Sequence, residues 1–416
     1  MDLIRDVLIQ QKRELAEQLK KTYIQRSIDP SRFANDMIEV ISGPRRAGKS
    51  FFCIRFLKTL GNFGYVNFDD ERLVDIKNYD EVVDVLKDLY DSPRILLLDE
   101  IQNVPGWELL INRLQRQGYN LIITGSNSNL LSKELATHLT GRHYTATIFP
   151  FSFKEYLSFF GNDITTSEIK QHLFRYMIQG GFPEPLVKNL DYRDYLATMF
   201  DAIIYKDIVK RFKVKNVHAI DELARYLVTN FTYEFSYTSI AKILGISVHT
   251  VQNYADYLEQ AFLVFTIPRF SWKLKSQISA NKKTYCIDNG FVHAKAFKVS
   301  PGQGHLYENI VAISLKQREL VRDIDLFFWK NDQQEEVDFV LKKGSRITEL
   351  IQVCYDISQP KTKERELRAL LKASDELSCD NLTVITEDQE SNDQTTWNGI
   401  TRQVHFIPLW RWLTRN

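Results

Sequence analysis

The residues best suited to chemistry in this chain form a glycine-rich segment that ends in a lysine and a serine. The segment follows an apolar run, residues 37–42, that predicts a buried strand, and it precedes residues 51–60, which predict a helix. Such a loop binds phosphate, because its glycines let backbone N–H groups converge and the helix N-terminus adds a favourable dipole. We expect Lys49 to contact the β and γ phosphates of ATP and the Ser50 hydroxyl to ligate Mg²⁺. The predicted nucleotide-binding residues are Gly43, Pro44, Arg45, Arg46, Ala47, Gly48, Lys49, Ser50 and Phe51.

A second apolar run, residues 95–98, ends in two acids, Asp99 and Glu100, about 50 residues after the glycine-rich loop. In this position Asp99 is expected to hold Mg²⁺ through water, and Glu100 to polarise the water that attacks the γ-phosphate. The two motifs have the pattern of Walker A and Walker B. A glutamate at position 100 favours hydrolysis over nucleotide binding alone.

A third apolar run, residues 121–127, ends in polar residues. A strand of this kind normally lies beside the P-loop strand and places a hydrogen-bonding side chain against the γ-phosphate. Thr124, Ser126 and Asn127 are the candidates for this sensor role, and we favour Ser126 or Asn127 because they end the strand. Arg142, after an expected helix, fits two roles: an arginine finger, in cis or from a neighbouring subunit, or a structural arginine.

Six motifs in order carry a family resemblance. The chain resembles the prokaryotic AAA-type P-loop ATPases whose C-terminal half is a domain of unknown function with a restriction-endonuclease-like fold. The resemblance covers nearly the whole chain, apart from the first 35 residues, and implies an ATPase core, a middle winged helix and a nuclease-like end. The motifs are GPRRAGKS, ILLLDEIQNVPGW, LIITGSNSNLLS, the pair Gly141-Arg142, IFPFSFKEYL and GGFPE.

We therefore predict an α/β fold with an AAA+-like parallel sheet and a helical lid, then a winged helix-turn-helix, then an α/β restriction-endonuclease-like domain. The predicted domains are 1–160 (ATPase core with an N-terminal amphipathic helix), 161–230 (lid), 231–283 (winged helix) and 284–416 (nuclease-like).

Charge by itself predicts no partner, because 54 Lys and Arg residues balance 53 Asp and Glu residues. A nucleic-acid partner would need a local basic face. The four cysteines are scattered without the paired spacing of a zinc site, which predicts reduced thiols in a cytoplasmic protein. No apolar run approaches the roughly 18 residues of a membrane span, so we expect no membrane partner.

Residues 237–247 predict the start of a helix-turn-helix, with Gly245 at the turn and Ser247 as the N-cap of the second helix. The second helix offers polar side chains that can contact bases, but residues 247–260 contain no Lys or Arg. Phosphate contacts would have to come from other lysines. DNA binding is favoured, and use of the helices for packing alone stays open. The candidate lysines are Lys242, Lys273, Lys275 and those in residues 206–215.

A nuclease of the PD-(D/E)xK type clusters a helix glutamate, a strand aspartate, and an acid and a lysine two residues apart on the next strand. Glu308 and Asp338 match the first two positions, but Gln352 and Cys354 occupy the other two. Glutamine is a weaker Mg²⁺ ligand and cysteine supplies no positive charge, so we expect no cleavage. A lysine from elsewhere could substitute, and the candidates are Lys330, Lys342 and Lys343.

Three functional hypotheses follow, and the oligomeric state stays open. The first is an ATPase, using ATP and Mg²⁺, that is coupled to double-stranded DNA through the winged helix. The second is an ATP-switched regulatory or scaffold protein that binds a protein partner through its C-terminal half. The third is an ATP-dependent nuclease in which another lysine replaces the missing one.

Overall fold

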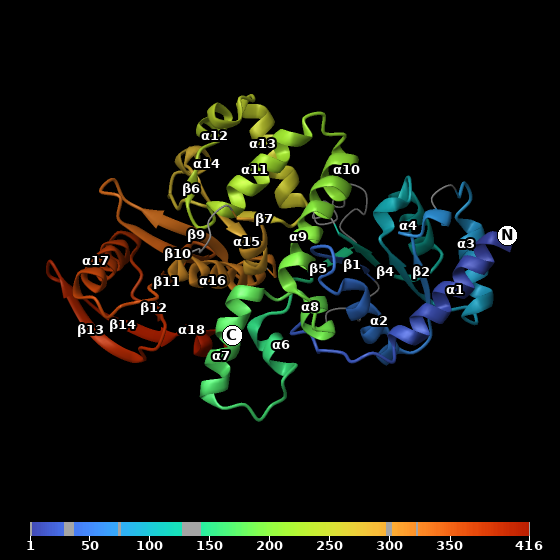
Figure 1. Ribbon diagram of the computed structural model, residues 1–416, viewed down its shortest axis with the longest axis horizontal. Coiled ribbons are helices and arrows are strands. Elements are labelled where there is room, and N and C mark those ends of the chain that lie inside the picture. The colour runs from blue at the N-terminus through green and yellow to red at the C-terminus, as the bar shows by residue number, and fades with distance from the viewer. Residues whose placement is uncertain are drawn as a thin grey trace. The chain divides into compact units, whose positions relative to one another are not determined.

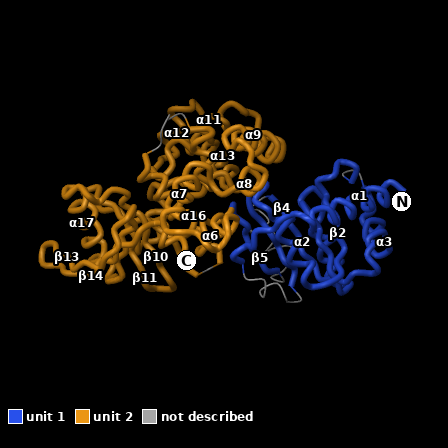
Figure 2. Tube along the Cα trace, turned by 60° about the horizontal axis from the view of Figure 1, so that its bottom comes forward, with its two compact units in different colours: residues 1–150 blue, residues 151–416 orange. Residues whose placement is uncertain are grey.

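The computed structural model describes residues 2–28, 37–73, 76–126, 143–296, 302–321 and 323–415. The chain forms two compact units, residues 1–150 and residues 151–416, which Figure 2 distinguishes by colour. Each unit has sheets of its own (Figure 1). The predicted boundaries inside residues 161–416 stay predictions, since these residues belong to one compact unit.

The first unit is built on a five-stranded parallel sheet in the order β2-β3-β4-β1-β5. The strand after the Walker B strand therefore lies beside the P-loop strand, as predicted. Nearly all of the residues in the first four strands are buried, because helices cover both faces of a parallel sheet. The strands are β1 (Ile38–Ser42), β2 (Phe63–Asn67), β3 (Ile95–Asp99), β4 (Asn120–Gly125) and β5 (His143–Thr147).

Helices α2, α3 and α4 connect strands of this sheet by crossovers, and α1 precedes the first strand. Right-handed crossovers place α2 on one face of the sheet and α3 and α4 on the other. The helices are α1 (Asp2–Gln18), α2 (Lys49–Leu60), α3 (Asp80–Leu89) and α4 (Trp107–Arg116), with short 3₁₀ turns η2 (Glu71–Leu73) and η3 (Ile101–Asn103).

Helix α1 is amphipathic, as predicted, and covers the edge strand β2. The Gln11 side chain donates to the carbonyl oxygen of Asn67 at 3.0 Å and accepts from the Asn67 N–H at 2.9 Å. This pair of bonds satisfies backbone groups that an edge strand otherwise leaves free. The same helix buries Val7 and Leu8 completely.

The second unit begins with a series of helices, two of which start with a capping box. Ser152 and Glu155 cap α6, and Thr165 and Glu168 cap α7. Each box pairs two backbone N–H groups that would otherwise lack partners. The elements are α6 (Phe153–Ser158), α7 (Thr166–Gln179), α8 (Pro183–Lys188), α9 (Tyr192–Ala202), the π-helical η5 (Ile203–Val209), α10 (Lys210–Phe212) and α11 (Val217–Thr229).

The GGFPE motif between α7 and α8 makes a close contact with Asp288. The Gly181 N–H donates to Asp288 Oδ2 at 2.7 Å. Gly180 has a φ of 77°, and a Cβ there would lie 1.7 Å from Asp288 Oδ1. Burial raises the pKa of Asp288 to about 7. Gly180 is therefore required for the close approach of this carboxyl group, whereas a Cβ on Gly181 would lie 2.3 Å from the carbonyl oxygen of Phe151.

A three-stranded antiparallel sheet in the order β6-β8-β7 follows, together with the two predicted helices (Figure 1). Gly245 ends the first of these helices with a φ of 64°, and Ser247 caps the next one by accepting from the Thr250 N–H at 3.0 Å. The predicted helix, turn and N-cap are confirmed. The elements are β6 (Glu234–Phe235), α12 (Tyr237–Leu244), α13 (Val248–Gln260), β7 (Val264–Pro268), α14 (Leu274–Ser279), β8 (Lys282–Cys286) and α15 (Asn289–Lys295).

The chain ends in a mixed six-stranded sheet with the order β13-β14-β12-β11-β10-β9. Strands β9, β10 and β11 form an antiparallel meander, and β12 is parallel to both β11 and β14. The Phe270 N–H, two residues beyond β7, donates to the carbonyl oxygen of Phe328 at 2.7 Å and joins this sheet to the smaller one. The elements are α16 (Gln303–Leu320), β9 (Asp325–Lys330), β10 (Glu336–Lys343), β11 (Arg346–Val353), α17 (Pro360–Leu377), β12 (Leu382–Thr386), β13 (Ser391–Trp397), β14 (Ile400–Pro408) and α18 (Leu409–Arg415).

One acid, Glu39, lies inside the P-loop strand with only 2% of its surface exposed. Neither carboxylate oxygen has a hydrogen-bond partner among the described residues. Burial raises the pKa of Glu39 from 4.5 to about 8. The folded protein therefore keeps this proton over a pH range in which the unfolded chain has lost it.

We predict that Glu39→Gln removes a pH dependence of stability. The stability contributed by Glu39 is fully present below pH 4.5 and is lost as the pH rises through about 8, because the unfolded chain then ionises more readily. The variant should unfold at a temperature roughly 5 °C above the wild type at pH 8.5, with a much smaller difference at pH 5. Calorimetry measures both values, with the exposed Glu17→Gln as control. An equal difference at the two pH values would show that Glu39 does not hold a proton.

Candidate functional site

The glycine-rich loop lies at the carboxyl end of β1 and leads directly into α2. Gly43 has a φ of 140°, and a Cβ on it would lie 2.1 Å from the carbonyl oxygen of Ile148. Gly48 has a φ of 95° immediately before the helix. Both glycines of the motif therefore have conformations that other residues rarely adopt.

Lys49 is buried at the first position of α2, with 4% of its surface exposed. Its ammonium group donates to the carbonyl oxygens of Gly43 and Pro44, both at 3.0 Å. These partners carry no net charge, so the positive charge is available to a phosphate group. The loop thus holds the lysine where the sequence predicts a contact with the β and γ phosphates.

The Walker B aspartate lies beside the P-loop serine. Asp99 Oδ1 accepts from Ser50 Oγ at 2.9 Å and also from the Thr124 hydroxyl. Burial and the neighbouring Glu100 raise the pKa of Asp99 to about 6, although the hydroxyl groups and Lys49 partly offset this. A hydroxyl and a carboxylate side by side are hard oxygen donors that fit Mg²⁺. Ser50 and Asp99 would hold this ion together with the phosphate oxygens.

Glu100 follows in a left-handed conformation, with a φ of 52°, and only part of its side chain is buried. Its N–H donates to Thr124 Oγ1 at 3.0 Å, and its carboxylate accepts from the Gln102 amide. Thr124 therefore contacts both acids of the Walker B motif. Strand β4 lies between β1 and β3, which explains why Thr124 near its end reaches the Walker B acids at the end of β3.

Three further residues were predicted to act at the nucleotide site: Ser126, Asn127 and Arg142. Ser126 is buried at the end of β4, with 5% of its surface exposed. Asn127 and Arg142 lie outside the described residues. The roles predicted for these three residues stay predictions.

Two predicted loop residues contact parts of the first unit outside the loop. Arg45 lies 3.7 Å from Asp69, which follows β2. The Phe51 ring packs 5.7 Å from the Tyr23 ring, with the Arg55 guanidinium 5.3 Å from the Phe51 centroid. These contacts fix the outer side of the loop and of α2.

A second group of charged residues lies in the other unit. Glu308 of α16 and Asp338 of β10, the two acids matching the nuclease pattern, are brought together and buried. Lys283 of β8 lies between them, with its Nζ atom 2.9 Å from Glu308 Oε1 and 3.3 Å from Asp338 Oδ1. Lys283 also pairs with Glu336. We refer to Lys283, Glu308, Glu336 and Asp338 as the acidic cluster.

Electrostatic shifts in the cluster follow from burial and from these pairs. Burial lowers the pKa of Lys283, but Glu308 and the other acids outweigh it, so the pKa lies well above its usual value. Burial and the nearby Glu308 raise the pKa of Asp338, and Lys283 offsets part of that rise. Lys283 is therefore a charged ammonium group at neutral pH.

The other two positions of the nuclease pattern have neutral side chains, as the sequence indicates. Gln352 Oε1 accepts from the Asp338 N–H at 3.2 Å, and Gln352 Nε2 donates to Glu366 at 2.7 Å. Burial raises the pKa of the Cys354 thiol to about 12, so it stays protonated and uncharged.

The sequence did not point to Lys283. Of the three candidate lysines, Lys342 and Lys343 pair with acids outside the cluster, Asp325 at 3.0 Å and Asp323 at 3.2 Å. Lys330 pairs with Glu234 and lies 3.6 Å from Glu336, the outer acid of the cluster. The predicted boundary after residue 283 assigned Lys283 to a different domain. Lys283 is the second of two consecutive lysines in the sequence, and nothing in that pair distinguishes the buried lysine from its half-exposed neighbour.

Comparison with known proteins extends these observations. Three families match consecutive parts of the chain: an AAA domain over residues 35–157, a domain of unknown function (DUF8612) over 170–301, and a domain of unknown function (DUF4143) over 303–412. The uncharacterized protein MJ1544 of Methanocaldococcus jannaschii is 34% identical over 420 residues, covering 96% of this chain and 92% of the relative. This chain belongs to the same family of AAA-domain proteins.

A second relative is consistent with this membership. An uncharacterized protein of Haemophilus influenzae is 32% identical to this AAA protein, over 78% of this chain and 84% of the relative. Among solved structures, the Walker-type ATPase PABY2304 of Pyrococcus abyssi is 15% identical with a TM-score of 0.44, covering 65% of this chain and 95% of that one. The AAA domain contains every described residue of the nucleotide site.

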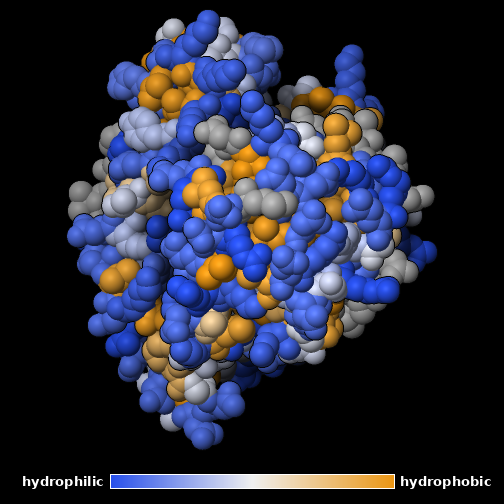
Figure 3. Space-filling view, turned by 90° about the vertical axis from the view of Figure 1, so that its right-hand side faces the viewer, coloured by the Kyte–Doolittle hydropathy of each residue, from blue (hydrophilic) through white to orange (hydrophobic). Residues whose placement is uncertain are grey.

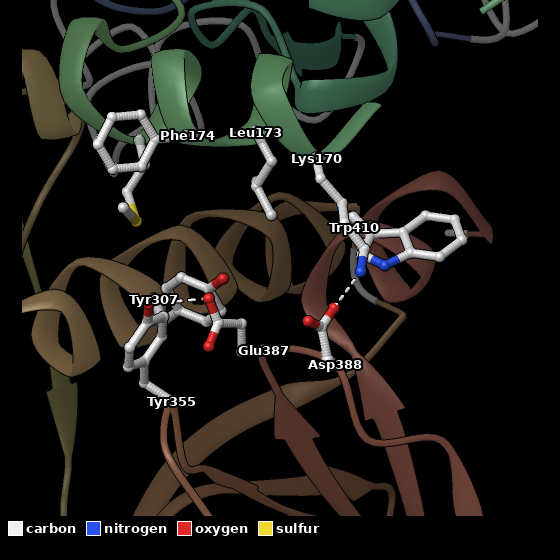
Figure 4. Close-up of a pocket in the computed structure, with 9 residues that line it drawn as sticks. Lys170, Leu173, Phe174, Tyr307, Tyr355, Glu387, Asp388 and Trp410 are labelled. Atoms are coloured by element: carbon white, nitrogen blue, oxygen red, sulfur yellow. Dashed lines mark hydrogen bonds and ion pairs between the residues drawn. The ribbon is translucent and has the colours of Figure 1, made fainter. Parts of the chain in front are cut away.

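The second unit also contains a small cavity of about 90 Å³ (Figure 4). Its polar groups pair with one another: Lys170 with Asp388, and the Tyr355 hydroxyl with Glu387 at 2.9 Å. The first pair connects α7 to the loop after β12. The lining residues are Lys170, Leu173, Phe174, Met177, Tyr307, Tyr355, Glu387, Asp388 and Trp410.

Hydrophilic residues cover most of the face drawn in Figure 3, with apolar residues in small groups between them. Among the described helices, none is long and apolar enough to cross a membrane.

We predict that Lys49→Ala weakens ATP binding by roughly tenfold to a hundredfold, because it removes a charged hydrogen-bond donor to phosphate. Titration calorimetry measures the affinity in the presence of Mg²⁺. Lys58→Ala, an exposed lysine on the same helix, is the matched control and should bind as the wild type does. Unchanged affinity of Lys49→Ala would contradict the nucleotide site.

Proposed function

We propose that the protein is an ATPase that binds ATP with Mg²⁺ and hydrolyses it in the AAA domain. The observation that carries this proposal is the hydrogen bond between Ser50 and Asp99, with Glu100 following directly. Lys49 neutralises charge on the phosphates, and Ser50 and Asp99 hold the metal ion. When bound, Mg²⁺ neutralises the charge that develops on the phosphoryl oxygens.

Glu100 is proposed to orient and deprotonate the attacking water. Its backbone is fixed by the bond to Thr124, so its carboxylate starts from a defined position beside Asp99. Positioned general bases contribute about a hundredfold or more to such reactions. The bond between Glu100 and Gln102 would have to break or turn for the carboxylate to reach water at the γ-phosphate.

Glu100→Gln should retain ATP binding but hydrolyse ATP about a hundredfold more slowly, because an amide cannot accept the proton. Phosphate release measures the rate, and calorimetry checks binding. Glu108→Gln, on α4 of the same unit, is the control. Hydrolysis by Glu100→Gln at the wild-type rate would exclude this role for Glu100.

We further propose that residues 217–286 form a winged helix that binds double-stranded DNA. Their order, α11-β6-α12-α13-β7-α14-β8, with an antiparallel three-stranded sheet, is that of a winged helix-turn-helix. The connection between β7 and β8 is the proposed wing. Its Lys273 and Lys275 are exposed. Trp272, which directly precedes Lys273 in the sequence, is 61% exposed.

A second source of positive charge lies next to α13. The Phe212 ring of α10 stacks on the Tyr257 ring of α13, with centroids 3.9 Å apart and planes 4° apart. This contact brings the chain around α10 to α13, the helix that would read base edges. Its exposed lysines could contact phosphates while α13 contacts bases. They are Lys206, Lys210, Lys213 and Lys215.

The double variant Lys273→Glu, Lys275→Glu should bind random duplex DNA more weakly and reduce the slope of log affinity against log salt by about 2, one for each phosphate that is no longer neutralised. Fluorescence anisotropy at several salt concentrations measures this. Lys20→Glu, Lys21→Glu, with exposed lysines of the first unit, has the same net charge and serves as control. Wild-type protein that shows no salt-sensitive binding would contradict the DNA proposal and favour a protein partner.

We also propose that residues 303–412 have a restriction-endonuclease-like fold that does not cleave DNA. The order α16-β9-β10-β11-α17-β12 places a helix glutamate and a strand aspartate together, as in such nucleases. The neutral Gln352 and the protonated Cys354 support the absence of cleavage. A protein partner of this domain remains the alternative use of its surface.

A further inference from the structure

Strand β8 carries two side chains into the acidic cluster. Glu308 Oε1 accepts from Lys283 Nζ at 2.9 Å and from the Tyr285 hydroxyl at 2.8 Å. Asp338 Oδ1 accepts from Lys283, and Asp338 Oδ2 accepts from the Val353 N–H at 2.9 Å. Three of the four carboxylate oxygens that Glu308 and Asp338 would offer to Mg²⁺ are therefore already bonded to groups of the protein.

We propose that Lys283 is the resident cation of the acidic cluster, taking the place of a divalent metal, and that the cluster is a structural joint between the three-stranded and six-stranded sheets. An ammonium group has three N–H donors, and three carboxylates surround this one: Glu308, Glu336 and Asp338. With 3% of its side chain exposed, Lys283 would be costly to bury without these partners.

The residues present do not fit a metal ion. Mg²⁺ requires near-octahedral oxygen ligands with free lone pairs. Among the described residues, no group of three or more His, Cys, Asp or Glu side chains is placed to hold a metal. The Gln352 carbonyl oxygen, the remaining candidate ligand, faces the Asp338 N–H. Lys283 thus supplies the positive charge that the metal would supply.

Neighbouring contacts show that the same strand is tied down along its length. The Asn309 side chain, next to Glu308 on α16, accepts from the Cys286 N–H and donates to the Cys286 carbonyl oxygen, both at 2.9 Å. Asn309 also donates to the Asn289 side chain at 2.8 Å. Helix α16 therefore holds β8 by backbone bonds at one residue and by buried ion pairs at another. Both kinds of bond join the smaller sheet to the C-terminal part.

The inference rests on the proposed non-cleaving domain, and two measurements without nucleotide separate their failures. Wild-type protein and Asp338→Asn are titrated with Mn²⁺ and followed by electron paramagnetic resonance. The two proteins should bind the same amount of Mn²⁺, because the acidic cluster holds none. Plasmid DNA with Mg²⁺ or Mn²⁺ should stay intact. An Asp338-dependent Mn²⁺ site without nicking overturns only the role of Lys283. Nicking that both Asp338→Asn and Lys283→Met abolish overturns both proposals and makes Lys283 a catalytic residue.

Stability provides an independent test. Lys283→Met leaves the acids without their counterion and should lower the unfolding temperature by roughly 10 °C, whereas Lys282→Met, on the same strand and half-exposed, should change it little. Adding Glu308→Gln to Lys283→Met removes one of the unpaired charges and should recover part of that stability. If Lys283→Met does not fold, a double variant that does fold supports the proposal in the same way as a recovered unfolding temperature. Equal stability of the two lysine variants, or no recovery, overturns the proposal.

Discussion

Parallel pairing of β3, β4 and β1 is the constraint on which the nucleotide site depends. Residues that are far apart in sequence, Ser50, Asp99 and Thr124, meet because the carboxyl ends of neighbouring parallel strands lie at the same edge. The Thr124 hydroxyl bonds to Asp99, and the Glu100 N–H bonds to the same hydroxyl. A shift in the register of β4 would remove the contacts of Thr124 with both Walker B acids.

In the second unit, the pairing of buried charges likewise brings together residues that are far apart in the sequence. An ammonium group and carboxylates that are removed from water must pair with one another, or they destabilise the fold. Lys283 meets this requirement by bonding to an acid of helix α16 and to an acid of β10, a strand of the six-stranded sheet. Asp288, two residues beyond β8, accepts the N–H of Gly181 after α7. Contacts on and just after one strand therefore connect the helical part, the smaller sheet and the larger sheet of the same unit.

The two units use acidic residues in different ways. In the AAA domain, Asp99 is bonded to neutral hydroxyl groups, so its carboxylate can still take part in binding a cation. In the acidic cluster, Glu308 and Asp338 face an ammonium group of the protein itself. The first arrangement suits an exchangeable ligand, and the second suits a permanent contact. This contrast is consistent with the proposed roles of the two sites, the first in nucleotide chemistry and the second in structure.

Local sequence determined the features that depend on neighbouring residues. The P-loop, the Walker B acids, helix α1 and the Ser247 cap were predicted because spacing, apolar periodicity and capping are properties of short segments. The position of β4 beside β1 was also predicted, through the resemblance of its motif to known ATPases. Tertiary structure alone decided that Thr124 contacts both Walker B acids and that Lys283 enters the acidic cluster. These contacts join strands and helices that are distant in sequence. A buried charge must be paired, but which residue pairs with it depends on the folded structure and not on the neighbouring sequence.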